Sequence, residues 1–498
     1  MDRESELLRA GRFDEAIAHA VRRTQGTPQA PEAWLALAQA QLAARRPEAA
    51  LAASDAGLTA APGDAPLLCA KAGVLRSLSR VDEATALYRQ VLTREPDHFD
   101  AGFGVTLLAV EAGDWAGAET WLRRLAAAHP GRPDLQWLGA RAAVGLGDLD
   151  RARGDLIQLS RDPRLAPDQR ADVLLLLGEA LDGLGRAREA FAAAAEGKTI
   201  QRRLYAERAA GREGAAERFA RLAAWFAAAD PAPWRTAPAP PRTVEDPAAH
   251  LFLVGFPRSG TTLLEQALAG HPQVVSLEEA PTLAAAHAEF LGSAEGLARL
   301  AVLSESEAQP WRARYWAEVA AHGLDPAGRV FLDKAPAGTE DLPLVAKLFP
   351  KARVLFAIRD PRDVVLSCLR QNFQMNALTY AFTDLASAAQ AYAGCMALAE
   401  VYRTVLPVDL HEVRHEALLD DFAGGLAKIC QAIGLAFDPA MADPAATARR
   451  RTVRTPSAPQ VRAGLNRQGV GRWRSYAPGL APVLPILDPW VRRLGYEV

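Results

Sequence analysis

The stretch Phe252–Gln266, FLVGFPRSGTTLLEQ, decides the fold of the C-terminal half of the chain. Gly255 and Gly260 stand five residues apart, as in the phosphate-binding loop G-x-x-x-x-G-K-[ST], and Thr262 occupies the hydroxyl position. An apolar run precedes the loop, and an amphipathic helical pattern follows it. We therefore predict a strand–loop–helix unit that binds an anion at the N-terminus of the helix.

The loop differs from that of a nucleotide triphosphatase at one position. Thr261 stands where those proteins have the lysine that reaches the β- and γ-phosphates, and Arg258 lies inside the loop. Backbone amides, two threonine hydroxyls and a guanidinium remain, and this set suits a smaller anion. The sequence therefore disfavours a kinase or a triphosphatase.

Composition bounds the class of protein. The chain has 498 residues, which is long enough for two or three domains. Half of the residues are hydrophobic and the formal net charge is −2, so no overall basic field favours nucleic acid. The four cysteines form no C-x-x-C pair, the charged N-terminus lacks the apolar centre of a secretory signal, and no apolar run reaches membrane-spanning length. We expect a soluble cytoplasmic protein with reduced thiols.

The N-terminal region repeats. Two residue types recur at an interval of 34 residues: the prolines Pro28, Pro62, Pro96 and Pro130, and the alanines Ala16, Ala50, Ala84, Ala118 and Ala152. Each unit contains two amphipathic helices, with a small alanine where they cross and a proline that ends the second helix. The period and these residues resemble the tetratricopeptide repeat. The alternative is an irregular alanine-rich helical bundle.

The changes in pattern predict three parts. Residues 1–229 form the repeat region, with a weaker fifth unit and a capping helix at its end. Residues 230–249 are rich in proline and form a semi-rigid linker. Residues 250–498 alternate short apolar runs with helical patterns, which is typical of an α/β domain with a central parallel sheet.

A second motif lies about a hundred residues after the loop, RVLFAIRDPRDVVLSCLRQNF, residues 353–373. It predicts a strand, then Asp360 as the helix cap with a proline in the first turn, then a helix. Arg359 at the end of the strand and Ser367 two turns into the helix are placed to converge on one phosphate. The alternative is an ordinary helix start with surface arginines.

The segment GFPRSGTTLLEQALAGHPQV resembles the 5′-phosphosulfate loop of sulfotransferases that use 3′-phosphoadenosine 5′-phosphosulfate (PAPS). It is most similar to the tyrosylprotein sulfotransferase-like branch, whose bacterial members often carry tetratricopeptide repeats. The resemblance covers about residues 250–498. It implies a P-loop-like sulfotransferase fold, PAPS as co-substrate and 3′,5′-ADP as product.

The resemblance also assigns nucleotide-binding residues in three segments. The loop implies contacts to the 5′-phosphosulfate from Arg258, Ser259, Gly260, Thr261 and Thr262. The second motif implies that Arg359 and Ser367 bind the 3′-phosphate, which ATP and GTP lack. The basic segment VRTPSAPQVRAGLNRQGVGRWRSY, residues 453–476, is similar to a lid over the nucleotide, with Ser457, Gln460, Val461, Arg462, Asn466 and Arg472 at matching positions. The alternative for this segment is a solvated loop.

Sulfuryl transfer requires cations near the transferring group and one base for the acceptor hydroxyl. Arg258 supplies one cation, and Lys334, which follows an apolar run in VFLDKAPAG, supplies the second. The chain has only six lysines, so a lysine at this place is notable. The resemblance assigns the base to Glu279 in SLEEAP, with Glu278 as the alternative.

Three positions depart from the family pattern. His415 stands where a tyrosine is usual, Gln371 where the phosphate helix has a second arginine, and Pro456 where the animal enzymes have a supporting serine. HEVRH, residues 411–415, formally fits the zinc-protease pattern H-E-x-x-H, but the preceding residues predict a strand and no third ligand follows. We expect no metal.

These observations favour a PAPS-dependent sulfotransferase whose repeats hold the acceptor, a polypeptide with a tyrosine hydroxyl. A glycan or small-molecule acceptor stays open, as does a homo-oligomer. The alternative of another class is a non-catalytic tetratricopeptide interaction scaffold, which the presence of Arg258, Lys334, Arg359 and Ser367 together disfavours.

Overall fold

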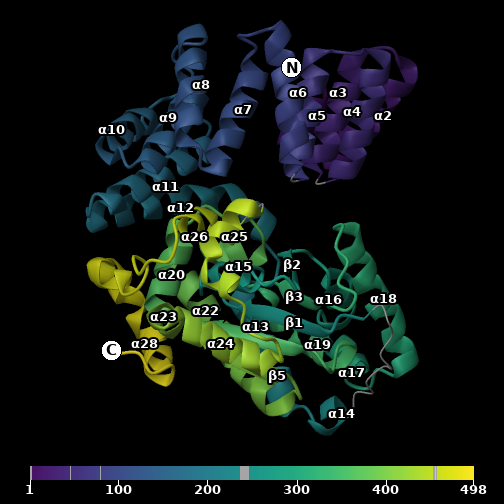
Figure 1. The fold of residues 1–498 in the computed structure, drawn as a ribbon, viewed down its shortest axis with the longest axis vertical. Helices are drawn as coiled ribbons and strands as arrows, with labels where there is room; N and C mark the ends of the chain where they lie inside the picture. The colour runs from purple at the N-terminus through teal and green to yellow at the C-terminus, as the bar shows by residue number, and fades with distance from the viewer. Residues whose placement is uncertain are drawn as a thin grey trace. The chain divides into compact units, whose positions relative to one another are not determined.

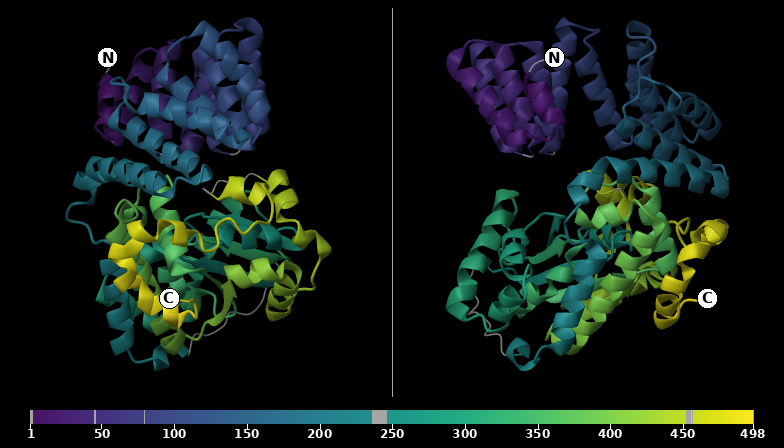
Figure 2. Two further views of the ribbon diagram at one scale, coloured as in Figure 1. Left: turned by 90° about the vertical axis from the view of Figure 1, so that its left-hand side faces the viewer. Right: turned by 180° about the vertical axis from the view of Figure 1, so that it is seen from behind.

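The computed structural model describes residues 3–44, 46–78, 80–235, 246–451, 455 and 457–497. The chain forms two compact units, one from residues up to 166 together with 179–185, and one from residues 167–178 and 186 onwards. The division falls inside α11 (Pro167–Gly183). Figures 1 and 2 show both units.

The first unit consists of antiparallel helical hairpins (Figure 1). Its helices are α1 (Arg3–Arg9), α2 (Phe13–Gly26), α3 (Pro31–Ala43), α4 (Pro47–Ala60), α5 (Ala65–Ser77), α6 (Val81–Arg94), α7 (Phe99–Ala112), α8 (Trp115–Ala128), α9 (Pro133–Leu146) and α10 (Leu149–Ser160). The alanines of the 34-residue period are all 0% exposed: Ala16, Ala50, Ala84, Ala118 and Ala152. A small side chain is needed there because the neighbouring helices cross closely.

Local signals end and begin these helices where the repeat pattern predicts. The four spaced prolines all lie in the turns that follow α2, α4, α6 and α8. Asp64 caps α5 by accepting a hydrogen bond from the Leu67 amide (2.9 Å). Gly113 ends α7 with φ of 78°, a left-handed conformation that favours glycine.

The second unit contains a five-stranded, fully parallel sheet in the order β2-β3-β1-β4-β5. The strands are β1 (Ala249–Gly255), β2 (Val274–Glu278), β3 (Val330–Lys334), β4 (Arg353–Ile358) and β5 (Asp409–Arg414). The principal helices are α12 (Ala187–Ala209), α13 (Ala215–Ala228), α15 (Thr261–Leu268), α16 (Ala284–Phe290), α17 (Ala294–Ala301), α18 (Glu305–Ala321), α19 (Leu342–Leu348), α20 (Pro361–Arg370), α22 (Leu385–Val405), α23 (His415–Asp420), α24 (Phe422–Ile433), α25 (Pro444–Arg450), α26 (Ala458–Arg462) and α28 (Leu484–Arg493). None of the helices in the described residues is both long and apolar enough to cross a membrane.

Helices cover both faces of the sheet (Figures 1 and 2). On one face, Leu264 of α15 and Leu426 of α24 share a core with Leu332 of β3. On the other face, the ring of Phe252 lies 6.1 Å from Tyr315 of α18, and further aromatic side chains extend this core. Strands buried on both faces explain the uninterrupted apolar runs of the sequence, and the α/β prediction is confirmed.

The helix predicted to cap the repeats, α13, packs instead along α22 of the second unit. Gly394 permits the close approach, because a Cβ there would lie 3.2 Å from the Cβ of Phe219. Phe226 contacts Tyr402 with ring centroids 4.9 Å apart, and Trp234 is 0% exposed. The apolar face of α13 is therefore buried against the α/β part. Residues 236–245 of the predicted linker lie outside the described residues.

Candidate active site

The candidate residues gather at the carboxyl ends of the parallel strands. β1 runs into the glycine loop, β4 ends just before Arg359, β3 ends at Lys334, and β2 ends beside Glu279. The chain leaves β1 toward β2, whereas β4 and β5 lie on the other side of β1. Open α/β sheets bind ligands at such a switch point, outside the carboxyl ends of the strands.

The loop between β1 and α15 depends on glycine at both ends. A Cβ at Gly255 would lie 2.7 Å from the Ala357 carbonyl oxygen, so only glycine fits beside β4. Gly260 has φ of 93° and precedes the first turn of α15. The free amides of that turn provide the donors of an anion site.

Backbone strain marks two of the candidate residues. In the part of the chain that the structure describes, Arg258 (φ 73°) and Glu279 (φ 49°) are the two non-glycine residues with positive φ. Such conformations cost of the order of 1–3 kcal/mol and are concentrated at functional sites. The strain therefore supports both positions independently of sequence motifs.

Arg258 joins the loop to α20 and to the lid segment. Its Nε donates to Ser367 Oγ (2.9 Å), its NH1 donates to Ser457 Oγ, and its NH2 donates to Gln460 Oε1 (3.1 Å). Burial, together with the nearby Arg359 charge, lowers the pKa of Arg258 to about 10. The guanidinium therefore still carries its charge at neutral pH, inside a cluster of neutral hydroxyl and amide groups.

Arg359 is only partly satisfied in the same region. Its NH1 donates to the Arg258 carbonyl oxygen (3.0 Å) and its NH2 donates to the Gly469 carbonyl oxygen (2.5 Å). Its Nε is buried without a hydrogen-bond partner among the described residues. A buried charged donor without an acceptor is costly, so this Nε is suited to bind an anionic oxygen.

Lys334 is enclosed by carboxylates. It is 0% exposed, and its Nζ lies 2.8 Å from Glu279 Oε1, 3.3 Å from Glu278 Oε1 and 3.3 Å from Glu265 Oε2. Burial alone would lower the pKa of Lys334, but the charges of these three carboxylates outweigh it and raise the pKa. The lysine is therefore held as a cation.

Glu265 of α15 is a member of this cluster that the motifs did not predict. It is 0% exposed and accepts a hydrogen bond from Ser276 Oγ (2.5 Å). Burial raises the pKa of Glu265, although Lys334 acts in the opposite direction. The sequence signal that could have found this residue is a glutamate between the apolar residues Leu264 and Ala267 of a short helix. Its partner on β3 could not be read from the pattern.

The two adjacent glutamates differ in access. The side chain of Glu279 is 45% exposed and that of Glu278 is 15% exposed. Only Glu279 therefore combines contact with Lys334 and ready access to solvent, which a base for an incoming hydroxyl needs.

A buried carboxylate on β3, that of Asp333, fixes the loop that follows Glu279. Asp333 Oδ2 accepts hydrogen bonds from Thr282 Oγ1 (2.9 Å) and from the Tyr315 hydroxyl (2.8 Å). The Tyr315 hydroxyl also lies 2.9 Å from His250 Nε2. Burial raises the pKa of Asp333 to about 6. The hydrogen bond from Thr282 to Asp333 thus anchors the loop that carries the candidate base to β3, on the face of the sheet that packs against α18.

The lid segment is fastened to α20 by a residue that the motifs also missed. Asp363 accepts hydrogen bonds from the amides of Gly471 and Trp473 (2.7 Å each), and burial raises its pKa to about 6. The guanidinium of Arg362 lies 3.7 Å from the centroid of the Trp473 ring. On the other side, Val461 packs against Leu263 of α15.

Comparison with known proteins identifies both parts of the chain. Residues 250–439 match the sulfotransferase family, and residues 75–143 and 5–65 match two tetratricopeptide repeat families. The chain carries tetratricopeptide repeats followed by a sulfotransferase-family domain. The order expected from the sequence, helical repeats followed by an α/β sulfotransferase-family domain, is thereby confirmed.

Two curated proteins and one solved structure are similar to parts of this chain. An uncharacterized protein of Aquifex aeolicus is 28% identical over 252 residues, which are 49% of this chain and 33% of that protein. The protein-tyrosine sulfotransferase of Drosophila melanogaster is 32% identical over 124 residues, which are 24% of this chain and 25% of that protein. The chain therefore spans a third or less of the length of these curated relatives. The sulfotransferase domain of the Synechococcus PCC 7002 olefin synthase is 25% identical, with a TM-score of 0.36, over 52% of this chain and 98% of that domain.

Two further residues of the lid segment make contacts of a different kind. Arg462 donates to the Ala448 carbonyl oxygen (3.4 Å), and Asn466 donates to the Gly464 carbonyl oxygen (3.0 Å). Arg472 begins a short helix next to Gly471. Pro456 lies outside the described residues. Ser457 and Gln460 thus contact the loop arginine, whereas Arg462 contacts α25 and Asn466 contacts the lid segment itself.

The remaining loop residues are buried at the start of α15. Ser259, Thr261 and Thr262 are between 2% and 4% exposed. The Thr262 hydroxyl lies 3.0 Å from the Thr455 hydroxyl, which ties the helix to the lid segment.

The HEVRH segment does not form the helix that a zinc protease uses. His411 lies in β5, and His415 is the first residue of α23, so the two histidines do not share a helical face. His415 instead lies against the loop, because a Cβ at Gly260 would be 2.4 Å from its Nδ1. Burial, with the charges of Arg359 and Arg258, lowers the pKa of His415 to about 3, so the imidazole is neutral.

Proposed function

We propose that this chain is a PAPS-dependent sulfotransferase that moves a sulfuryl group to an acceptor hydroxyl. The observation that carries the proposal is the convergence of Arg258, Lys334 and Arg359 at the strand ends of a sulfotransferase-family domain. The cations lie beside a solvent-accessible carboxylate, which is the combination that sulfuryl transfer requires.

The residues present fit the two anionic ends of PAPS. The unpartnered Nε of Arg359 and the hydroxyl of Ser367 suit the 3′-phosphate, and the neutral His415 lies nearby. Arg258 and the first-turn amides of α15 suit the 5′-phosphosulfate. When bound, PAPS supplies the activated sulfuryl group.

In the proposed reaction, Glu279 takes the proton of the acceptor hydroxyl as its oxygen forms a bond to sulfur. The bond between sulfur and the bridging phosphate oxygen breaks, and Lys334 and Arg258 stabilise the charge that develops on that oxygen. Glu279 is paired with Lys334 in this structure (2.8 Å), so the lysine exchanges part of its contact with the carboxylate for the leaving oxygen. Glu265 and Glu278 keep the lysine positioned during this exchange.

We assign the acceptor to a polypeptide tyrosine held by the repeats. Two observations support this choice: tetratricopeptide repeats commonly present a surface to peptides, and one relative is a protein-tyrosine sulfotransferase. The labelling experiment distinguishes this acceptor from a glycan or a small phenol.

The direct test is incubation of the full chain with radiolabelled PAPS and a lysate of the source cell, followed by fractionation. We expect label in a protein fraction and, after hydrolysis, in tyrosine sulfate. A parallel reaction with EDTA tests the expectation that arginine and lysine suffice without a metal. Label confined to glycan or small molecules would replace the acceptor, and no label in any fraction would contradict the activity.

Nucleotide selectivity tests the binding assignment separately. We expect 3′,5′-ADP to bind more tightly than ATP, and Arg359→Ala combined with Ser367→Ala to weaken 3′,5′-ADP binding by about 10-fold or more, because charge-assisted hydrogen bonds are lost. Isothermal titration calorimetry measures both. Arg314→Ala, at an exposed position on α18, is the matched control. ATP binding as tight as that of 3′,5′-ADP would overturn the assignment.

A further inference from the structure

The two candidate catalytic segments continue into elements that are fixed from outside the site. The chain runs from Glu279 into α16 (Ala284–Phe290) and from Lys334 into a short helix, η1 (Gly338–Asp341). Whatever holds α16 and η1 in position therefore also limits the movement of Glu279 and Lys334 relative to each other.

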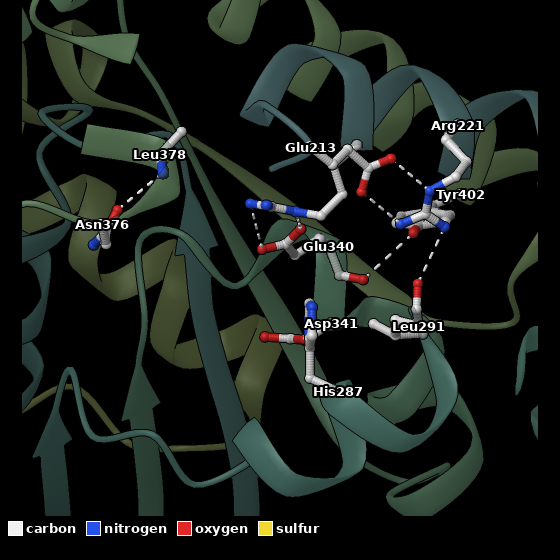
Figure 3. Close-up of polar contacts among 10 residues, drawn as sticks. Glu213, Arg221, His287, Leu291, Glu340, Asp341, Asn376, Leu378 and Tyr402 are labelled. Atoms are coloured by element: carbon white, nitrogen blue, oxygen red, sulfur yellow. Dashed lines mark hydrogen bonds and ion pairs between the residues drawn. The ribbon is translucent and has the colours of Figure 1, made fainter. Parts of the chain in front are cut away.

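Helix α13 contacts both of these elements (Figure 3). Arg218 of α13 donates to both carboxylate oxygens of Glu340 in η1, from Nε at 2.5 Å and from NH2 at 3.3 Å. Arg221, one turn later, donates from NH1 to the carbonyl oxygen of Leu291 at the end of α16 (3.1 Å). Glu213 accepts from the other two nitrogens of Arg221, at 2.6 and 3.0 Å, and so orients that side chain.

The two elements are also joined to each other and to the phosphate loop. His287 Nδ1 of α16 lies 2.7 Å from Asp341 Oδ1 of η1 (Figure 3). Thr339 Oγ1 of η1 donates to the Gly255 carbonyl oxygen (2.7 Å), where the loop begins. The Tyr402 hydroxyl of α22 lies 3.4 Å from the Glu340 carbonyl oxygen. These contacts connect α13 to all three parts of the site.

The central pair is largely removed from water. The side chains of Arg218 and Glu340 are 16% and 13% exposed, and burial raises the pKa of Glu340 despite the nearby Arg218. A buried two-point ion pair contributes little net stability, but it restricts geometry strongly. The main effect of this ion pair is therefore to hold η1 in place, and its contribution to stability is secondary.

We propose that α13 is a brace for the active site, and that Arg218 is a positioning residue that holds the segments after Glu279 and Lys334. It adds to the hydrogen bond that the Glu279 amide donates to the Lys334 carbonyl oxygen (2.8 Å). The catalytic part of this inference rests on the proposed function. The brace is supplied by chain that precedes the Pro-rich stretch, so the sulfotransferase-family match, which begins at residue 250, does not contain it.

The first test is Arg218→Met in the full chain, with Arg212→Met as the control. Arg212 is exposed, six residues earlier, and loses the same charge. Hydrogen exchange should increase in residues 280–291 and 335–341 for Arg218→Met only. The kcat for transfer from PAPS to a tyrosine-containing peptide should fall by about 10- to 100-fold, because displacement by about 1 Å has such effects. The affinity for 3′,5′-ADP should not change.

The pH dependence of the His287–Asp341 contact gives an independent readout. Burial alone would lower the pKa of His287, but the hydrogen bond and charge of Asp341 outweigh it and raise the pKa, with Glu340 also favouring and Arg218 opposing protonation. The link is therefore fully present below pH 6.5, the unfolded value, and is lost as pH rises through the higher folded pKa. Protection of α16 from exchange, corrected for the intrinsic rate, should decrease over that range, and His287→Asn should abolish the decrease.

Two further variants separate positioning from loss of folding. Arg218→Met with Glu340→Gln leaves no unpaired charge and should remain slow, whereas Arg218→Glu with Glu340→Arg should regain part of the kcat. Unchanged kcat and unchanged exchange in Arg218→Met would overturn the brace. If the wild-type chain transfers nothing to any peptide, the proposed function fails, while the exchange data still decide whether α13 holds α16 and η1.

Discussion

Replacing Glu279 by glutamine should lower kcat for sulfuryl transfer by about 100-fold or more and leave the affinity for 3′,5′-ADP unchanged. Glutamine keeps the shape of the side chain and still accepts a hydrogen bond from Lys334, which lies 2.8 Å away. It cannot take the proton of the acceptor. Single-turnover measurement with radiolabelled PAPS separates the chemical step from binding, which calorimetry measures.

The neighbouring glutamate provides the matched control. Glu278 also contacts Lys334 (3.3 Å), but its side chain is 15% exposed against 45% for Glu279. Glu278→Gln should therefore reduce kcat much less. If the two variants behave in the opposite way, Glu278 is the base. If both remain fully active, His415 becomes the candidate, and the assignment of the loop after β2 is withdrawn.

The parts of the fold that sequence predicted depend on local rules. The 34-residue period fixed the helical hairpins, because a buried alanine and a terminating proline recur in each of them. The loop between Gly255 and Gly260 predicted a strand and a helix within one short stretch, and both are present. Residues close in sequence determine such units, so one chain is enough to recognise them.

The parts that sequence did not predict depend on contacts between distant segments. Glu265 and Lys334 are 69 residues apart, and their pairing follows only from the parallel order that places β3 beside β1. Asp363 lies in the first turn of α20, where the sequence motif assigns it no role, yet it holds the lid segment more than a hundred residues away. The positive φ of Glu279 is likewise a property of the folded loop and has no composition signal.

The location of α13 shows why boundaries are hard to predict. Its apolar face suits either the end of a helical solenoid or the side of α22, and amphipathicity alone does not distinguish the two. The domain boundary after residue 229 marks the end of the repeat pattern, whereas the compact units divide near residue 186. A fragment that begins at residue 230 lacks both Arg218 and the buried Lys198, whose Nζ donates to the Gln371 carbonyl oxygen (2.5 Å) at the end of α20.

Replacing Lys334 by methionine should both abolish measurable transfer and destabilise the protein, by about 3–5 kcal/mol at neutral pH. The substitution removes a cation that contacts Glu265, Glu278 and Glu279 together. Glu265 suffers most, because it is 0% exposed and would retain the hydrogen bond from Ser276 and the weaker influence of the Arg451 charge. Lys428→Met, at an exposed position on α24, should change neither property.

The pH dependence of this variant identifies the cause. Burial already raises the pKa of Glu265 above its ordinary value of 4.5 in the presence of the lysine, and loss of the lysine raises it further. A carboxyl group whose pKa is higher in the folded than in the unfolded protein favours folding when it is protonated. The free-energy cost of burying it therefore grows as pH rises from the unfolded pKa toward the folded pKa. The destabilisation of Lys334→Met should therefore shrink as pH falls, and urea unfolding at several pH values measures it.

Adding Glu265→Gln to Lys334→Met should recover stability without recovering transfer, because the buried charge is removed while the catalytic cation is still missing. Recovery of transfer together with stability would show that Lys334 serves the fold and not the reaction.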